Sequence, residues 1–298
     1  MWQRLLKPFF FIPKFANVDA DYIADLQLRN AYNENGFVVL KNAVDADVLQ
    51  IIESAYAQFI TQTFPDNSDF ITSPNFGGDV QQAVQKQLSE VNQRILKKQF
   101  ILEKCRSDFF SILVIKPKAE NKYLSAHQDI SFVDEQYGCS SFLWIPVDDI
   151  NTENGAITVL PKSHKWARWQ KTHNREISPL LKNNAWIQER MQPVFMQKGD
   201  ALLFDASLIH GSLPNRSATN RIAMNTAICH AHLPLVHYEC SDKKQAFVTK
   251  YSVDETFWRD FKFTQAVPTG MYASTEEPFI WNKPLSKWNL KFLLDSVS

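Results

Sequence analysis

The feature that most constrains the fold is a series of short apolar runs between residues 108 and 232. The runs are rich in β-branched and aromatic residues and are separated by turns of Asn, Gly, Pro and Ser. They read FFSILVIKP, SFLWIPVDD, GAITVLP, DALLFDASLIHGS and RIAMNTAICHAH. Runs of this length, composition and spacing are typical of strands in a β-sandwich or barrel. We therefore predict that this part of the chain forms a mainly β core.

The residues before this core predict helices instead. Apolar positions recur there at roughly helical spacing, with polar residues between them. We expect three helices, over residues 19–35, 45–64 and 79–104. Gly36 is a stop signal for the first helix, and FVVL at residues 37–40 has the pattern of a short buried strand. A flanking helical layer with one strand is thus expected in this part of the chain.

The last part of the chain, residues 233–298, carries many aromatic residues without clean periodicity. It can cover either the β core or the mouth of a cavity in that core. A chain of 298 residues can bury one large hydrophobic core. We therefore expect a single domain, built from a helical layer (1–107), a β core with the metal site (108–232) and an aromatic-rich extension (233–298).

The overall composition argues against several classes of partner. Lys plus Arg and Asp plus Glu both number 32, so the formal net charge is zero, which gives no electrostatic footprint for nucleic acid. No segment approaches the roughly 18 apolar residues of a membrane span. The N-terminal stretch MWQRLLKPFFFIPKF is expected to pack on its own domain as an arm, and peripheral contact with a membrane surface is the alternative.

The cysteines indicate a compartment. The chain has four cysteines, Cys105, Cys139, Cys229 and Cys240, and none of them forms a CxxC motif. Without a disulfide framework or an export signal, free thiols in a reducing environment are the default expectation. We therefore expect a cytoplasmic protein.

Two residues in the stretch AHQDISFVDE suggest a metal site. His127 and Asp129 stand two positions apart, and side chains at i and i+2 of a strand point to the same face. His210 in DASLIHGS supplies a third donor on another strand of the same core. Two histidines and one carboxylate form the facial triad of non-haem Fe(II) oxygenases, which leaves open positions on the metal. A structural zinc site would instead have four protein ligands, usually including thiolates.

A nearby arginine suggests an anion site beside the metal. Ser212 lies two residues after His210, hence on the same strand face, and Arg221 begins the next apolar run. An antiparallel hairpin would bring Arg221 beside Ser212, where guanidinium and hydroxyl can together hold a carboxylate. Asn225 shares strand parity with Arg221, so it points inward too, toward a co-substrate or a backbone group. The alternative is a surface arginine that ends a turn.

Together these motifs resemble the phytanoyl-CoA dioxygenase family of Fe(II)- and 2-oxoglutarate-dependent oxygenases. The resemblance covers roughly residues 20 to 228. The matching segments are NENGFVVLKNAVDADVLQ, HQD, LWIPVDDINTENGAITVLPKSHK, KGDALLFDASLIHGSLPN and the arginine of NRIAMN. The family's proline-glycine-serine-histidine turn reads PKSH here, and its His164 is expected to be structural.

The resemblance implies a fold and a set of roles. It implies a double-stranded β-helix (jelly roll, cupin-like) core, with His127, Asp129 and His210 as ligands of Fe(II). It implies that Arg221, assisted by Ser212, binds the distal carboxylate of 2-oxoglutarate. Lys116, on the strand before the HQD motif, is expected to face the co-substrate as well.

The implied activity is a dioxygenase reaction. With O2, 2-oxoglutarate would be converted to succinate and CO2 while an unactivated C–H bond of a small molecule is oxidised, most simply by hydroxylation. The aromatic residues of the C-terminal third suit a largely apolar or ring-containing substrate. Two alternatives remain open at this point: a cupin-like isomerase or hydrolase that uses its metal as a Lewis acid, and a non-catalytic binding protein on the same fold. A second metal pair in CHAH, His230 and His232, lacks a third donor at convincing spacing.

Overall fold

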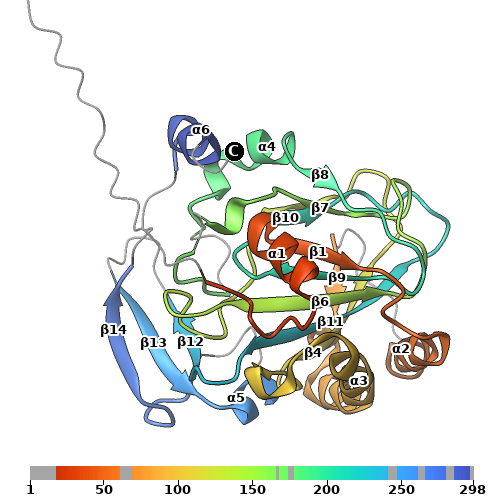
Figure 1. Ribbon diagram of the computed structural model, residues 1–298, viewed down its shortest axis with the longest axis horizontal. Helices are drawn as coiled ribbons and strands as arrows, with labels where there is room; N and C mark the ends of the chain where they lie inside the picture. The colour runs from red at the N-terminus through yellow and green to blue at the C-terminus, as the bar shows by residue number, and fades with distance from the viewer. Residues whose placement is uncertain are drawn as a thin grey trace, which may run out of the picture.

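The computed structural model describes residues 18–60, 69–165, 168–173, 178–240, 247–260, 266–279 and 285–295. Its centre is an antiparallel seven-stranded sheet in the order β1-β9-β6-β11-β4-β2, with β3 paired to β11 (Figure 1). The strands are β1 (Phe37–Leu40), β2 (Ile71–Thr72), β3 (Cys105–Arg106), β4 (Ser111–Lys116), β6 (Ser140–Pro146), β9 (Ala201–Asp205) and β11 (Arg221–His230). Most of the apolar runs of the sequence therefore contribute a strand to this sheet: β4, β6, β9 and β11 come from four of the five runs.

A second, four-stranded sheet lies against one face of the first, in the order β5-β10-β7-β8. Its strands are β5 (Leu124–His127), β7 (Ile157–Val159), β8 (Gln192–Pro193) and β10 (His210–Ser212). Phe142 and Trp144 of β6 pack into a cluster with Ile157 and Val159 of β7, so the space between the sheets is apolar. Two facing antiparallel sheets confirm the predicted jelly-roll core.

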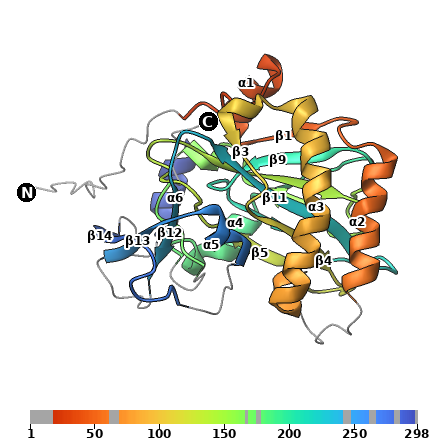
Figure 2. The same cartoon turned by 90° about the horizontal axis from the view of Figure 1, so that it is seen from below.

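The large sheet is buried on both faces, which explains why its strands read as nearly continuous apolar runs. Leu143 and Ile145 alternate with the inward residues of β6 and belong to a different cluster, which they share with helix residues. Helices α1 (Leu26–Asn35), α2 (Ala46–Phe59) and α3 (Gly78–Gln99) form the predicted helical layer. Figure 2 shows α2 and α3 side by side along the sheet.

The predicted helix bounds are partly wrong, for identifiable reasons. The first helix begins at Leu26 rather than residue 19, because the Asp25 carboxylate accepts a hydrogen bond from the backbone N–H of Leu28 (2.9 Å) and caps it there. The third helix ends at Gln99, since Phe100 is extended and bridges to Ile23. A 3₁₀ turn, Leu102–Lys104, follows. The second helix ends at Phe59, and residues 61–68 lie outside the described part.

The C-terminal part forms a small antiparallel sheet of β12 (Leu235–Glu239), β13 (Phe247–Val253) and β14 (Ser274–Pro278). Helices α4 (Asn184–Gln188), α5 (Glu255–Asp260) and α6 (Lys287–Asp295) complete the described elements. Trp258 is buried against the inter-sheet cluster, whereas Trp288 on α6 is exposed. The extension therefore covers the core with some of its aromatic residues, while Phe261, Trp281 and the N-terminal arm lie outside the described residues.

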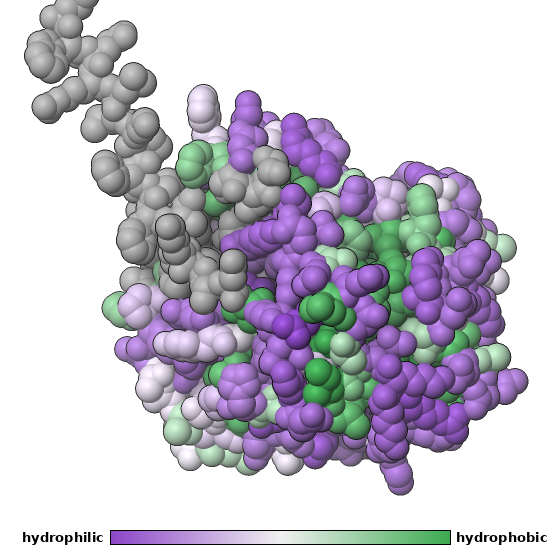
Figure 3. Space-filling view, in the orientation of Figure 1, coloured by the Kyte–Doolittle hydropathy of each residue, from purple (hydrophilic) through white to green (hydrophobic). Residues whose placement is uncertain are grey.

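The surface in Figure 3 is mostly hydrophilic, with apolar side chains scattered over it. Among the helices described, none combines the length and the apolar character needed to cross a membrane.

Candidate active site

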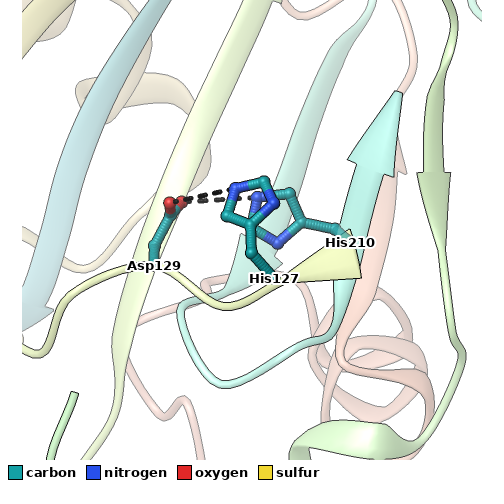
Figure 4. Close-up of side chains that lie close together, drawn as sticks. All are labelled: His127, Asp129 and His210. Atoms are coloured by element: carbon teal, nitrogen blue, oxygen red, sulfur yellow. Dashed lines mark ion pairs between the residues drawn. The ribbon is translucent and has the colours of Figure 1, made fainter. Parts of the chain in front are cut away.

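Three potential metal ligands converge at the pairing of β5 with β10. His127 lies directly opposite His210 across these strands, and the two imidazole rings are 4.3 Å apart between centroids. The Asp129 carboxylate reaches both: Oδ1 lies 3.8 Å from His127 Nε2, and Oδ2 lies 3.6 Å from His210 Nε2 (Figure 4). Ligand atoms about 2.1 Å from one ion lie about 3 to 4 Å apart, so the spacing fits a single metal ion.

The backbone carrying Asp129 differs from the prediction. The sequence predicted His127 and Asp129 on one strand, but β5 ends at His127 and Asp129 follows in a loop. Strand alternation is therefore not what brings the two side chains together. Instead, the backbone N–H of Asp129 donates to the carbonyl of Ala206 (3.1 Å), in the turn that leads to His210. This contact fixes the loop against the second histidine.

Backbone contacts set the tautomer of both imidazoles. Nδ1 of His127 lies 2.8 Å from the Ser125 carbonyl, and Nδ1 of His210 lies 3.0 Å from the Leu208 carbonyl. Because a carbonyl oxygen only accepts, each Nδ1 carries the hydrogen and donates it. Each Nε2, directed toward the Asp129 carboxylate, then carries the lone pair that a metal requires. Among the described residues, no other group of three His, Cys, Asp or Glu side chains is placed to hold a metal ion.

The three residues open into a cavity of about 420 Å³ between the two sheets. Most of its wall is apolar and comes from both sheets, including Phe110, Ile112, Phe142, Trp144, Ile157 and Phe204. The cavity is large enough for a small organic molecule. The three candidate metal ligands therefore face a space in which further ligands can bind.

Arg221 and Ser212 line the same cavity, but the predicted hairpin between them is wrong. β10, which carries Ser212, pairs with β5 and β7, whereas β11, which begins at Arg221, pairs with β3, β4 and β6. In a two-sheet core, strands that follow each other along the chain often lie in opposite sheets. The two residues therefore belong to facing sheets.

The surroundings of Arg221 suit an anion. Its side chain is 5 % exposed, its Nη1 donates to the Gly155 carbonyl at 2.5 Å, and its guanidinium lies 4.9 Å from the centre of the Trp144 ring. No carboxylate in the described ranges forms an ion pair with it, and burial lowers its pKa to about 9. Arg221 Nε and Ser212 Oγ are both buried without a hydrogen-bond partner. A bound carboxylate would satisfy both groups.

Lys116 and Asn225 lie differently with respect to the cavity. Lys116 pairs with Arg221 across β4 and β11 and is almost fully buried, but it is not part of the cavity wall, and its Nζ donates to the Asp69 carbonyl (3.1 Å). Burial, and then the charge of Arg221, lower its pKa to about 7. Asn225 does line the cavity, and its Oδ1 is buried without a partner.

The remaining histidines of the motifs have structural contacts. His164 Nε2 lies 3.1 Å from the Asn33 carbonyl, and His230 Nε2 lies 3.1 Å from the Asp19 carbonyl, so both ring nitrogens donate to backbone oxygens. His164 therefore fastens the PKSH turn to the end of α1, as expected.

Two buried histidines predict a loss of stability in acid. Burial lowers the pKa of His164 to about 4 and that of His237 to about 3. Between these values and about pH 6.5, both histidines are therefore protonated in the unfolded chain and neutral in the folded chain. The contribution of these two histidines to folding stability is therefore complete above about pH 6.5 and is lost as the pH drops toward 4, by up to about 1.4 kcal/mol per pH unit for each histidine. Urea unfolding at pH 7.5, 6 and 5 measures this slope. A His164→Gln variant should show a shallower slope, and an unchanged slope would contradict the assignment.

Several cavity residues carry no signal in the sequence. Thr72 and Asn75 enter the wall from the short segment before α3, and Thr172 and His173 enter it from the long connection after β7. None of them belongs to a motif or to a periodic run. Only the folded arrangement of the connections brings them to the cavity.

Fold and site together define a class: the non-haem iron dioxygenases that use 2-oxoglutarate as co-substrate. The family model described as phytanoyl-CoA dioxygenase (PhyH) matches residues 32–223. The chain belongs to this family.

Curated and structural relatives agree with this assignment. The peroxisomal phytanoyl-CoA dioxygenase of Bos taurus is 26% identical over 279 residues, covering 82% of this chain and 80% of that protein. The crystal structure of EvdO2 from Micromonospora carbonacea var. aurantiaca, complexed with 2-oxoglutarate, has a TM-score of 0.53 at 16% identity and covers 72% of this chain and 94% of its own. HygX from Streptomyces hygroscopicus, with nickel and 2-oxoglutarate bound, has a TM-score of 0.51 at 15% identity and covers 70% and 88%. At these identities the two structures support the fold.

Proposed function

We propose that this dioxygenase hydroxylates an unactivated C–H bond of a small molecule, with Fe(II) held by His127, Asp129 and His210. We further propose that Arg221 and Ser212 bind the distal carboxylate of 2-oxoglutarate. The observation that carries the proposal is the buried Arg221, which has no carboxylate partner among the described residues and lines the same cavity as the three metal-binding side chains. A buried cation of this kind is costly unless an anion meets it.

The residues that line the cavity fit both Fe(II) and 2-oxoglutarate. The two Nε2 lone pairs and the Asp129 carboxylate would coordinate Fe(II). Within the same cavity, the unpartnered Arg221 Nε and Ser212 Oγ would donate hydrogen bonds to the carboxylate of 2-oxoglutarate. When bound, Fe(II) and 2-oxoglutarate supply, with O2, the oxidation of the C–H bond and the release of succinate and CO2. The cation–carboxylate contact at Arg221 would fix the orientation of the co-substrate.

The protein's own contribution is positioning. The backbone carbonyls of Ser125 and Leu208 hold the imidazoles in the ligand tautomer, and the apolar wall keeps competing water from the reacting centre. No general acid or base is required by this arrangement, so the absence of a Ser/His/Asp or paired-carboxylate motif in the sequence is consistent with it. Selectivity would come from holding one C–H bond of the substrate near the metal.

The cavity supports a largely apolar or ring-containing substrate. Its wall carries aromatic rings on the side of the large sheet, such as Phe110, Phe142 and Phe204, and such surfaces bind apolar groups. In this proposal Asn225 contacts a polar group of either ligand. The expectation that Lys116 faces the co-substrate gains no support, because Lys116 lies outside the cavity wall and its Nζ donates to the Asp69 carbonyl.

We also propose a cytoplasmic location. Cys105, Cys139 and Cys229 are free thiols, as expected in a reducing compartment. The bovine relative is named as peroxisomal, so fractionation of cells that express the tagged protein decides between the two compartments.

The direct test is a succinate assay. Protein purified without oxygen is mixed with Fe(II), 2-oxoglutarate and O2, with and without a pool of small metabolites, and succinate is measured. We expect iron-dependent succinate that the His210→Ala variant loses. A protein that binds iron but neither binds 2-oxoglutarate nor forms succinate would favour the Lewis-acid or non-catalytic alternatives.

A further inference from the structure

Five polar residues form a buried cluster at the turn between β9 and β10. The cluster consists of Glu135, Arg168, Lys171, Asp205 and Ser207, and the side chains of the four charged members are at most 4 % exposed. None of these residues lines the main cavity. The roles proposed above for the metal and the co-substrate therefore leave this cluster unexplained.

The contacts of the cluster join three separate segments of the chain. Lys171 Nζ pairs with the Glu135 carboxylate and donates to Ser207 Oγ at 2.9 Å, and the Ser207 hydroxyl donates to Glu135 in turn. Arg168 Nη2 pairs with Asp205 Oδ2 at 2.5 Å, and Asp205 Oδ1 accepts from the Ser207 backbone N–H at 2.7 Å. The cluster thus ties the loop after Asp129 and the residues 168–171 to the turn after β9.

That turn contacts two of the three candidate metal ligands, Asp129 and His210. The Ala206 carbonyl accepts the backbone N–H of Asp129, and the Leu208 carbonyl lies 3.0 Å from His210 Nδ1. Ser207, which stands between these two residues, is the member of the cluster that contacts Glu135, Lys171 and Asp205 together. A shift of Ser207 would therefore move the supports of Asp129 and His210 at once.

Fold stability is a poor explanation for such a cluster. Taking two ion pairs out of water costs free energy that their attraction repays only in part, and apolar residues of similar volume often replace such pairs without loss of stability. Outer contacts that orient metal ligands, in contrast, commonly set metal affinity. The cluster has the placement of such an outer contact.

We propose that Glu135, Lys171 and Ser207 are positioning residues that hold the 205–208 turn, so that Asp129 and His210 converge on one metal ion. The inference rests on the metal site proposed above. It adds that metal affinity depends on three residues that do not touch the metal, the co-substrate or the cavity.

The test compares two charge-neutralised pairs. In Lys171→Met/Glu135→Gln the buried pair is removed, and in Lys165→Met/Glu34→Gln an ion pair with exposed Glu34 is removed in the same way. Mn(II) binding is measured by equilibrium dialysis, and the visible absorption spectrum of the Co(II) form reports the ligand geometry. We expect the buried double variant to bind Mn(II) about 10- to 100-fold more weakly, with an altered Co(II) spectrum. The exposed double variant should match the wild type in both.

A folded buried double variant with wild-type Mn(II) affinity and spectrum would overturn the inference. If that variant does not fold, the same measurements on Ser207→Ala test the inference, because this substitution removes only the hydroxyl that bridges Lys171 and Glu135. We expect a folded protein with Mn(II) affinity reduced by about 10-fold, and unchanged affinity would overturn the inference equally. Failure of the wild type itself to bind Mn(II) would instead reject the proposed metal site, so the two failures are distinguishable.

Discussion

Asp129→Ala is expected to abolish iron-dependent succinate formation and to weaken metal binding by about 100-fold or more. Loss of an outer contact alone costs about 10- to 100-fold in metal affinity, and Asp129 is the carboxylate placed between the two histidine Nε2 atoms. It also supplies the negative charge among the three proposed ligands. Fe(II) or Mn(II) titration followed by the succinate assay measures both effects.

The matched control is Asp148→Ala, which removes an exposed carboxylate from a loop outside the cavity. It should leave metal affinity and succinate formation unchanged. The thermal stability of metal-free Asp129→Ala should match that of the wild type, since the Asp129 side chain is 19% exposed and pairs, within the described part of the chain, with the two histidines. Retention of iron-dependent turnover by Asp129→Ala would rule out the proposed ligand set.

The sequence singled out the three side chains that the fold brings together as candidate metal ligands, even though part of the geometric reasoning failed. Strand alternation was offered as the reason for the His127 and Asp129 pair, yet Asp129 lies in a loop held by Ala206. The prediction rested on residue type and on the order of the motifs along the chain, and it did not depend on the local backbone geometry.

The prediction for Ser212 and Arg221 failed in a different way. Their separation along the chain suggested a hairpin, but sheet membership depends on long-range pairing of β10 with β7 and of β11 with β6. A single sequence contains little information on such pairing, because each strand has several compatible partners of similar length. Both residues nevertheless reach the cavity, since facing sheets direct their inner side chains into the same space.

The buried cluster around Ser207 shows what sequence reasoning could not supply. Glu135, Arg168 and Lys171 look like ordinary charged loop residues in the sequence, where such residues are usually exposed. Their burial follows from the way the connections after β5 and β7 pack on the turn after β9. Irregular segments carry no periodic pattern from which this packing can be predicted.

The second large effect is expected from Arg221→Met, which should raise the 2-oxoglutarate concentration needed for half-maximal succinate formation by about 10- to 100-fold. A hydrogen bond to a charged group contributes about 1.5 to 3 kcal/mol, and the Arg221 guanidinium presents a buried Nε that lacks a partner. Arg221 stays charged at neutral pH, because burial lowers its pKa only to about 9. Mn(II) affinity measured without 2-oxoglutarate should not change.

Arg216→Met is the matched control, because it removes an exposed arginine from the turn between β10 and β11. Its 2-oxoglutarate requirement should equal that of the wild type, and normal dependence in Arg221→Met would refute the carboxylate-binding role. Stability separates this role from a structural one. A methionine avoids the cost of a buried cation without a carboxylate partner, so metal-free Arg221→Met should unfold at a urea concentration no lower than the wild type. If Arg221→Met weakens 2-oxoglutarate binding without lowering the stability of the fold, then Arg221 serves binding and not folding.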